Sequence, residues 1–255
     1  KFTTTVFRSM KISLQNRGSM GDRQNYSHSY KYIPEQYLEI NTDSWQSSLN
    51  FTHSVSNNFF YDVRSSYFNQ GYYSGLHKDT SEYLPTGQWE YFSEYGDGFE
   101  FYKKADPVEL WDSRTATADI KADAVWQIDE LNELKLGAQF QKHWLDLFYI
   151  YDPQRNYPYL NDYNTEPYEI AAYFHDKSEL PYLILTLGLR WDYSNANVSF
   201  RSDPLDSTTL VESGSKSQFS PRIGIAHPIS DRTKLHFSYG HFFQIPEFQY
   251  LFENN

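Results

Sequence analysis

Apolar and polar side chains alternate strictly along several stretches of the chain, and residues 116–128 show the pattern most clearly. The even-numbered positions there are apolar, namely Ala116, Ala118, Ile120, Ala122, Ala124, Trp126 and Ile128. The positions between them are mostly polar and include Thr117, Asp119, Lys121, Asp123 and Gln127. After the turn "DELN", Leu134, Leu136, Ala138 and Phe140 continue the alternation. A period of two predicts paired β-strands rather than helices.

Three further stretches repeat this unit of strand, short turn and strand. The first runs from Trp45 to about Tyr67 and turns at "SNN", and the next runs from about Tyr168 to Trp191 and turns at "SELP". The last covers 222–240 and turns at "HPISDRT". With one more strand expected in residues 1–12, the pattern predicts an all-β fold of about nine antiparallel strands.

The predicted connections differ sharply in length. Turns within the hairpins take a few residues, whereas the segments between hairpins are long, roughly 13–43, 69–112, 145–167 and 194–217. Loops above about 15 residues are uncommon in compact domains. Here they occur at every second connection, so all of them would emerge at the same end of the sheet. Short turns at one end and long loops at the other are typical of an outer-membrane barrel.

Strand length and tryptophan placement also favour a membrane barrel. The alternation over 116–128 is much longer than the usual strand of about five or six residues. It suits a strand tilted through an apolar band of about 25 Å. Four tryptophans lie near predicted strand ends, where an interfacial girdle would place them: Trp45, Trp126, Trp144 and Trp191. A large soluble β-sandwich or propeller with core tryptophans is the alternative that the pattern leaves open.

In the membrane interpretation the two faces of the hairpin at 222–240 meet different solvents. The side chains expected to face lipid are Ile223, Ile225, Leu235, Phe237 and Tyr239. Those expected to face the barrel lumen are Gly224, Ala226, His236 and Ser238.

Composition restricts the function classes. The mean hydropathy of −0.71, with no apolar run near the roughly 18 residues that a membrane helix needs, excludes helical membrane spans. Aromatic residues make up 19% of the chain, which argues against disorder. The absence of cysteine excludes disulfides, thiol catalysis and thiolate metal sites. A formal charge of −11 argues against a nucleic-acid partner.

The stretch "SPRIGIAHPISDRTKLHFSYGHFFQIPEFQYLFENN" (220–255) resembles the TonB-dependent outer-membrane receptors of the Bacteroidetes type. The segments "EIAAYFHDKSEL…LILTLGLRWDY" (169–193) and "ELNELKLGAQFQKH" (130–143) are similar to two further hairpins of that family. Residues 1–110 share only the style of strands and loops.

The resemblance implies a transmembrane barrel of 22 antiparallel strands, closed by an N-terminal plug domain. It implies uptake of a scarce ligand driven by energy that TonB delivers to a short box before the plug. The sequence shows no plug, TonB box or closing strand, so we expect residues 1–255 to be a partial receptor barrel domain. The expected location is the bacterial outer membrane. The expected partners are membrane lipid and lipopolysaccharide, the TonB complex through the missing N-terminal part, and a surface lipoprotein or another outer-membrane protein.

No catalytic constellation appears in the sequence. There is no nucleophile elbow, phosphate loop or HExxH motif, so we expect no enzyme activity and no cofactor. His143 and His236 fall on polar-face positions, where a hydrogen bond in the lumen is favoured over metal ligation. The segment "EYGDGFE" (94–100) offers three carboxylates around two glycines, but without EF-hand spacing a solvated turn is favoured over a Ca²⁺ site.

The long loops hold the best candidates for ligand binding. Segment 69–112 contains eleven aromatic residues and nine acids against three Lys, and segment 145–167 contains six aromatics and four acids against one Arg. The candidate ligand-binding residues are Trp89, Tyr91, Tyr95, Trp111, Tyr151, Tyr157 and Tyr159. For any single ring, packing within a folded extracellular cap or against a partner protein is the favoured alternative.

Polar residues of the predicted lumen face form a second candidate set: Asp119, Lys121, Asp123, Arg190 and Arg222. They could contact a plug or substrate, although mutual pairing within the wall is the simpler account. Active uptake is therefore the leading functional hypothesis. A structural or adhesive outer-membrane barrel that binds a partner protein through aromatic loops is the second, and a soluble β scaffold is the third.

Overall fold

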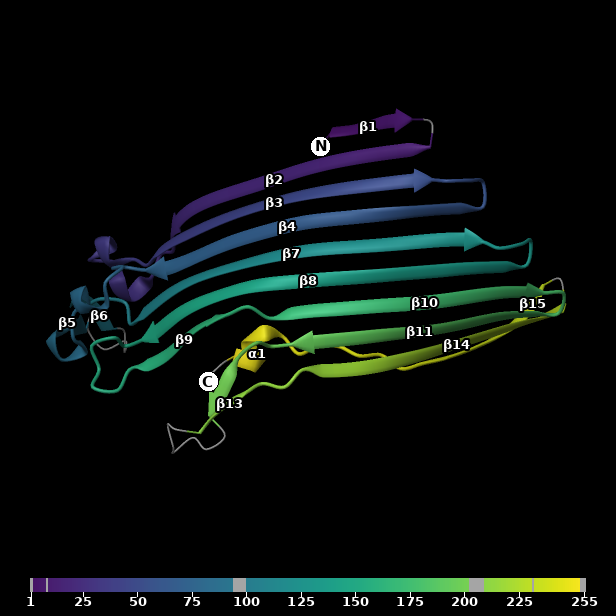
Figure 1. Cartoon of the computed structure of the whole chain (residues 1–255). Coiled ribbons are helices and arrows are strands. Elements are labelled where there is room, and N and C mark those ends of the chain that lie inside the picture. Colours follow the sequence, from purple (N-terminus) through teal and green to yellow (C-terminus); the bar gives the residue numbers. More distant parts are fainter. Residues whose placement is uncertain (1, 8, 94–99, 202–208, 231, 253–255) are drawn as a thin grey trace.

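The computed structural model describes residues 2–7, 9–93, 100–201, 209–230 and 232–252, and most of them form one large curved antiparallel sheet (Figure 1). Neighbouring strands follow the order β1-β2-β3-β4-β7-β8-β10-β11-β14-β15, and β9 pairs with β8. The bounds are β1 Phe2–Phe7, β2 Met10–Gln24, β3 Glu39–Ser54, β4 Phe59–Gly75, β7 Glu109–Gln127, β8 Asn132–Tyr151, β9 Tyr159–Thr165, β10 Tyr168–Leu180, β11 Leu183–Asn195, β14 Lys216–Ser230 and β15 Thr233–Gly240. Among the described residues, β1 and β15 form the two edges of the sheet. The sheet is therefore a barrel wall that does not close on itself.

The connections alternate between short and long, as the sequence predicts. Short turns join the strands at the right-hand end of Figure 1, for example 55–58, 128–131 and 181–182. The other end carries the longer segments with their small elements: η1 His28–Tyr30, η2 Pro34–Gln36, η3 Thr80–Glu82, η4 Thr86–Gln88, β5 Glu90–Ser93, β6 Glu100–Lys104, β12 Ser199–Arg201 and β13 Leu210–Glu212. Among the described residues no helix combines the length and the apolar character of a membrane-crossing helix.

The strands reach further towards the long loops than the sequence analysis expected. Residues 13–24 were assigned to a loop but belong to β2, and 39–43 belong to β3. Likewise β8 continues to Tyr151, well beyond the expected loop start at 145. In these extensions polar and apolar residues occur on both faces, so the alternation fades, while the backbone ladder continues regardless of side chains. Because β1 and β2 are two strands where the pattern predicts one, the main path has ten strands among the described residues instead of about nine.

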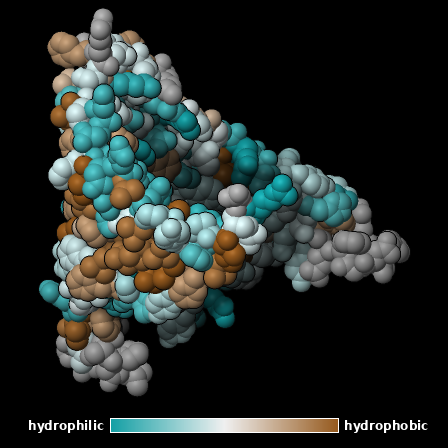
Figure 2. Space-filling model, turned by 90° about the vertical axis from the view of Figure 1, so that its right-hand side faces the viewer, coloured by the Kyte–Doolittle hydropathy of each residue, from teal (hydrophilic) through white to brown (hydrophobic). Residues whose placement is uncertain are grey.

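Strand register divides the side chains into an apolar face and a polar face. Across β11, β14 and β15, Leu187 pairs with Ile223 and Ile223 with Tyr239, so their side chains share the apolar face. On the polar face, Gly188 pairs with Arg222 and Arg222 with Gly240. The predicted division of the 222–240 hairpin is therefore confirmed. Figure 2, viewed from the end with the short turns, shows apolar side chains gathered along the left and lower parts of the surface.

The apolar face is open to its surroundings. Large apolar side chains on it are substantially exposed, including Leu189 at 46%, Phe237 at 58% and Tyr239 at 54%. A sheet face of this extent, with no layer packed on it, would be costly in water, whereas hydrocarbon satisfies it.

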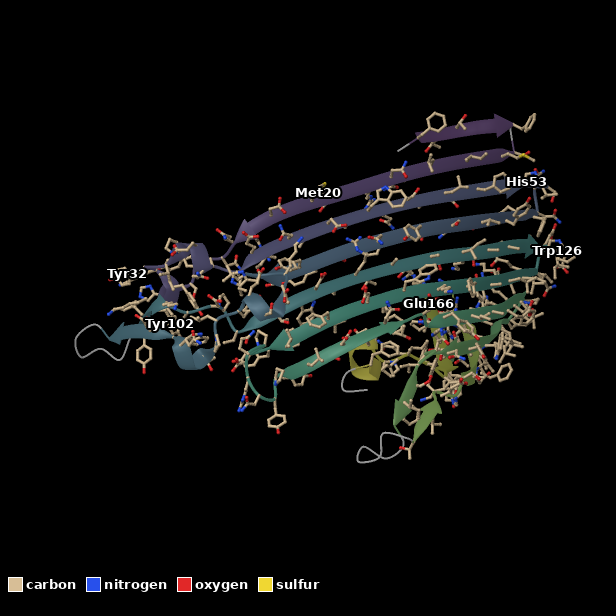
Figure 3. All side chains as sticks on the ribbon, turned by 60° about the vertical axis from the view of Figure 1, so that its left-hand side comes forward. Met20, Tyr32, His53, Tyr102, Trp126 and Glu166 are labelled. Atoms are coloured by element: carbon tan, nitrogen blue, oxygen red, sulfur yellow. The ribbon has the colours of Figure 1, made fainter. Side chains whose placement is uncertain are left out.

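Two belts of aromatic rings bound the apolar face. At the loop end, Trp45 and Trp144 lie in one cross-strand row with Asn69 and Ala116, and the ring of Tyr67 lies 5.7 Å from that of Trp45 and 6.5 Å from that of Trp144. At the turn end, Trp126 pairs with Phe59; Figure 3 shows Trp126 there.

The spacing of the belts fits a bilayer. Ala116 and Trp126 lie ten positions apart on β7, which is about 33 Å along a strand. With a tilt of about 40°, this length spans about 25 Å, the height of the apolar band of an outer-membrane barrel.

Candidate functional site

Asp123 is the centre of a hydrogen-bonded network on the polar face of the sheet. Its carboxylate accepts a hydrogen bond of 2.6 Å from the hydroxyl of Tyr173 and lies 3.1 Å from Nζ of Lys121. The Asp123 side chain is only 14% exposed, so these partners compensate for its lost hydration. Three neighbouring strands, β7, β8 and β10, position the network, because Tyr173 reaches over Gly137 of β8 to Asp123 of β7.

The other polar-face candidates also contact groups within the wall. Asp119 accepts a hydrogen bond of 2.7 Å from Nε2 of Gln139. Arg190 pairs with Asp192 at 2.8 Å. Arg222 lies over the ring of Phe242, with Cζ 5.0 Å from the ring centre. These contacts agree with mutual pairing, and a role of these residues towards plug or substrate stays a prediction.

His143 connects this face to the C-terminal segment of the structure. Its Nδ1 lies 2.9 Å from Oγ1 of Thr117, and its ring lies 4.8 Å from the ring of Phe248 in helix α1 (Phe248–Phe252). Phe252 is 1% exposed and lies 5.5 Å from the ring of Tyr163. After β15, residues 241–252 therefore cross the polar face and pack on β8 and β9.

Above the loop-end belt, aromatic rings join three loops into one unit, here called the cap (residues 25–38, 76–93 and 100–108). Tyr30 and Trp89 pack on Tyr102 with ring centres 4.8 and 5.4 Å away. Tyr32 packs on Phe101 at 5.6 Å. Figure 3 shows Tyr32 and Tyr102 on the same side of this unit. Many rings of the cap therefore hold its loops to one another.

Buried polar contacts fix the cap to the end of the sheet. The Tyr83 hydroxyl accepts hydrogen bonds from the backbone N–H groups of Leu76 and His77 and donates one to the carbonyl of Glu109. Burial raises the pKa of Tyr83. Asp106, 7% exposed, accepts a hydrogen bond of 2.7 Å from the N–H of Leu84.

The predicted ligand-binding residues do not form a single cluster. Trp89 packs inside the cap and donates its indole N–H to the carbonyl of Leu84. Tyr91 in β5 is 57% exposed, and Tyr157 in the loop after β8 is 89% exposed. Tyr95 lies outside the described residues, as do positions 94–99 of the segment considered for Ca²⁺.

Trp111 and Tyr159 both line one hollow, which we call the aromatic groove. Its volume is about 310 Å³, and its rings are those of Trp111, Tyr149, Tyr159 and Tyr163. The rings of Trp111 and Tyr149 are 4.9 Å apart, and those of Tyr149 and Tyr159 are 6.0 Å apart. Tyr151 lies directly opposite Tyr159 in the register, but it is not one of the residues that line the groove.

Polar residues, including Asp146, complete the aromatic groove. The indole N–H of Trp111 donates a hydrogen bond of 3.0 Å to Oγ of Ser113, which fixes the orientation of the indole. Thr115 and Asn161 also line the hollow. Burial, followed by the charge of Glu109, raises the pKa of Tyr149, so this hydroxyl is uncharged at neutral pH.

The sequence matches the family model described as "TonB dependent receptor-like, beta-barrel" over residues 2–255. The chain belongs to this family of receptor barrels. No curated protein matches the sequence.

Solved structures agree with the family at the level of the fold. The copper transporter OprC superposes with a TM-score of 0.64 at 14% identity, covering 98% of this chain and 37% of that one. The ferric citrate transporter FecA gives 0.55 at 11% identity, covering 93% and 34%. The outer membrane transporter YddB from Escherichia coli gives 0.56 at 12% identity, covering 89% and 28%. The chain thus spans about a third of the length of these structures.

Membership of the TonB-dependent receptor-like barrels assigns the two faces and the two ends of the wall. The protein is located in the bacterial outer membrane, where the apolar face meets lipid and the polar face lines the lumen. The short turns are periplasmic, and the cap and the long loops are extracellular. The aromatic groove therefore lies on the lumen side, near the extracellular end of this receptor barrel.

Sequence reasoning missed two of the four rings of the groove in this receptor barrel, Tyr149 and Tyr163. Both fall in stretches that were expected to be loop, although they continue the odd-numbered polar-face positions of β8 and β9. Extending the period-two pattern past Trp144 would have placed Tyr149 on the same face as His143. Tyr163 became recognisable only once β9 was seen to pair with β8.

Proposed function

We propose that the chain is part of an outer-membrane active-transport receptor, which takes up a scarce ligand with energy delivered by TonB. The observation that carries the proposal is the family match over residues 2–255. The polar face also supports the proposal. Several of its charged side chains have partners within the wall, as expected for a face that lines a hydrated lumen. We propose that the complete receptor also contains a plug, the remaining strands and a TonB-binding segment. The TonB complex would supply the energy.

Ligand capture is assigned in this proposal to the aromatic groove. Trp111 and Tyr159 come from the predicted set, and Tyr149 and Tyr163 join them, whereas a role for Tyr151 stays a prediction. Rings that border a hollow on the lumen side are well placed to receive a ligand that enters between the extracellular loops. Trp89 is assigned a structural role in the cap instead, because its ring and its N–H group both have partners there.

A structural or adhesive barrel is the second candidate, and the exposure of Tyr91 and Tyr157 favours it. Rings that project from extracellular loops suit contact with a surface lipoprotein or another outer-membrane protein. In both candidates the apolar face contacts membrane lipid and lipopolysaccharide, with Trp45 and Trp144 at the outer interface.

The uptake proposal can be tested without knowing the ligand. Periplasmic extracts of wild-type cells, cells lacking this receptor and cells lacking TonB are compared by mass spectrometry after growth on the same medium. Uptake predicts at least one solute that is depleted in both mutants and restored by the receptor gene. If no solute depends on both genes, the uptake proposal is wrong and an adhesive role gains support. The full-length gene gives a second test, since uptake requires a plug and a TonB box upstream of residue 1.

A further inference from the structure

Another hollow lies on the outward face of the wall, at the level of the loop-end belt of aromatic rings. Its volume is about 430 Å³. The lining residues that matter most are Asn69, Arg114, Trp144, Asp146 and Glu166. We propose that this hollow, here called the rim hollow, binds the phosphoethanolamine headgroup of a lipid in the outer leaflet. The inference concerns the lipid side of the wall and is independent of the uptake proposal.

Strand register places the rim hollow on the lipid side. Arg114 pairs with Asp146 two positions beyond the belt pair of Ala116 and Trp144, with no register shift between the two pairs. Because successive side chains of a strand alternate between the faces, all four side chains point outward. Strand β8 separates the rim hollow from the aromatic groove, so Asp146 borders both hollows while its side chain projects to the lipid side.

The depth of the rim hollow matches the headgroup layer of the membrane. Arg114 lies two positions beyond Ala116 on β7, about 6.6 Å along the strand. With a tilt of about 40°, this distance is about 5 Å above the belt. The headgroup layer on each side of the hydrocarbon core is about 5–7 Å thick. Headgroups are therefore level with Arg114 and Asp146, whereas a solute in the lumen is separated from them by the wall.

Arg114 and Asp146 carry opposite charges and are direct cross-strand neighbours, but they do not pair with each other. The guanidinium of Arg114 instead reaches across Gly71 to Asp43, at 3.2 Å, and to Asn69, at 2.7 Å. Within the described part of the chain, the carboxylate of Asp146 has no hydrogen bond or ion pair. The rim hollow thus offers a cation and an available carboxylate side by side, which a ligand with both charges can satisfy together.

The ammonium group of the headgroup is assigned to Asp146 and the ring of Trp144. The protein itself holds an ammonium group in this way on the same face. Nζ of Lys142 lies 2.7 Å from a carboxylate oxygen of Glu166, which directly follows β9 (Figure 3), and 5.2 Å from the centre of the Trp144 ring. Asp146 provides a second carboxylate two positions from that ring. A carboxylate beside an aromatic ring attracts an ammonium group by charge and by a cation–π interaction.

The phosphate group of the headgroup is assigned to Arg114. Its side chain is 55% exposed, and its guanidinium carries more N–H groups than Asp43 and Asn69 engage. Arg114 can therefore donate a charge-assisted hydrogen bond to a phosphate oxygen without giving up the contacts that orient it.

The charge balance of the rim hollow selects a zwitterionic headgroup. The charged side chains at the hollow are two cations and three carboxylates, namely Arg114, Lys142, Asp43, Asp146 and Glu166. This surplus of negative charge disfavours a headgroup with a net negative charge, such as that of phosphatidylglycerol. Phosphocholine is zwitterionic, but methyl groups replace the N–H donors that Asp146 would accept from. Phosphoethanolamine provides both the phosphate and the donors.

The test measures lipid binding to the full-length receptor purified in detergent. Phosphatidylethanolamine, phosphatidylcholine and phosphatidylglycerol with the same acyl chains are titrated separately, and bound lipid is quantified by native mass spectrometry. We expect phosphatidylethanolamine to bind most tightly. Asp146→Asn and Arg114→Gln should each weaken its binding by about threefold to tenfold, as expected for a charged hydrogen bond at an interface.

Asp162→Asn is the matched control. Asp162 projects from the same face of β9, farther from the membrane, and is not among the lining residues, so its loss should leave binding unchanged. A melting curve shows whether each variant folds, and Asp146→Asn carries the test if Arg114→Gln does not fold. Equal binding of the three phospholipids overturns the inference. So does a preference for phosphatidylethanolamine that Asp146→Asn leaves unchanged, or that Asp162→Asn reduces equally.

Two further arms identify the source of the headgroup. Lipopolysaccharide with phosphoethanolamine groups is compared with lipopolysaccharide that lacks them, and water-soluble glycerophosphoethanolamine is tested alone. If lipopolysaccharide binding depends on the group and on Asp146, the ligand is lipopolysaccharide. If phosphatidylethanolamine alone shows this dependence, the ligand is the phospholipid, and both results agree with the inference. If the soluble compound binds as tightly as the lipids, the rim hollow is a solute site and the lipid assignment is wrong.

Discussion

The ring of Tyr173 lies directly across the backbone of Gly137, its cross-strand neighbour, and this contact brings the Tyr173 hydroxyl to Asp123. A Cβ atom at position 137 would lie 2.1 Å from Cε1 of Tyr173 and 2.7 Å from Oδ1 of Asp123. Glycine is therefore required here by the close approach of a ring, and not by its own backbone conformation. The wall gains an aromatic contact and a charge-assisted hydrogen bond in one place.

Gly137→Ala should displace Tyr173 from Asp123 and destabilise the barrel. Overpacking of this kind costs about 1–3 kcal/mol. The loss is measured as a lower midpoint in urea unfolding of the protein refolded in lipid vesicles. Gly18→Ala is the control, because a Cβ there meets only the carbonyl oxygen of Ser44 at an ordinary 3.6 Å. Equal stability of both variants would contradict the proposed role of the contact.

Charges should be tolerated very differently on the two faces of β11. Leu187 faces lipid and Thr186 faces the lumen. Leu187→Lys should cost about 2–4 kcal/mol, as expected for a lysine near the middle of the bilayer. Thr186→Lys should cost much less, because its ammonium group remains hydrated. The comparison uses folding yield and unfolding midpoint in the same vesicles, and a similar cost at both positions would refute the assignment of the faces.

Asp106 should be essential for the packing of the cap. Asp106→Ala leaves the partly buried N–H of Leu84 without its acceptor, at a cost of about 1 kcal/mol. The cap should then be cleaved faster by protease added outside whole cells. Asp106→Asn keeps an acceptor oxygen in the same place and should restore most of the protection. Cleavage of Asp106→Ala at the wild-type rate would show that the aromatic contacts alone hold the cap.

The periplasmic turn at Asp129 should depend on pH. Its carboxylate accepts hydrogen bonds from the side-chain amide of Asn132 and from the backbone N–H groups of Leu131 and Asn132. The Asn132 bond is the main cause that holds the pKa of Asp129 below its usual value. Because the folded state lowers this pKa, the carboxylate stabilises the fold above its unfolded-state pKa and loses this effect as the pH falls through the lowered value.

Asp129→Ala should therefore fold less stably than wild type at neutral pH, and the difference should shrink in strong acid. Urea unfolding at a series of pH values measures both. Glu130→Ala, which removes the adjacent exposed carboxylate, serves as control and should show no such convergence. A pH-independent difference for Asp129→Ala would mean that the turn is held by its backbone alone.

Much of the barrel wall could be predicted from the sequence, because hydrocarbon imposes a simple rule on one face. Wherever lipid is present, every second residue must be apolar, as in the hairpin from Ala116 to Phe140. Beyond the aromatic belts this requirement ends, and the strands continue with no periodic signal, as in residues 19–24 of β2. The true lengths of the strands are fixed there by backbone pairing, which the pattern of side chains does not reveal.

The candidate site was less accessible to sequence reasoning for a related reason. The sequence of an extracellular segment does not show whether an aromatic residue packs in the cap, as Trp89 does, or lines the groove, as Trp111 does. The difference arises from register, which places Trp111 beside Tyr149 on β8. Lumen charges were easier to identify, because Asp119 and Asp123 occupy the positions between the apolar, lipid-facing residues of the same strand.

The central claim is that alternate residues of the wall face lipid and lumen. The chain has no cysteine, so single cysteines can be introduced and spin-labelled at successive positions of β14. In vesicles, labels at Ile223→Cys and Ile225→Cys should be relaxed mainly by oxygen dissolved in the bilayer. Labels at Gly224→Cys and Ala226→Cys should be relaxed mainly by a water-soluble nickel chelate. A strict alternation is the predicted result, and equal access of the nickel chelate to all four positions would contradict the account.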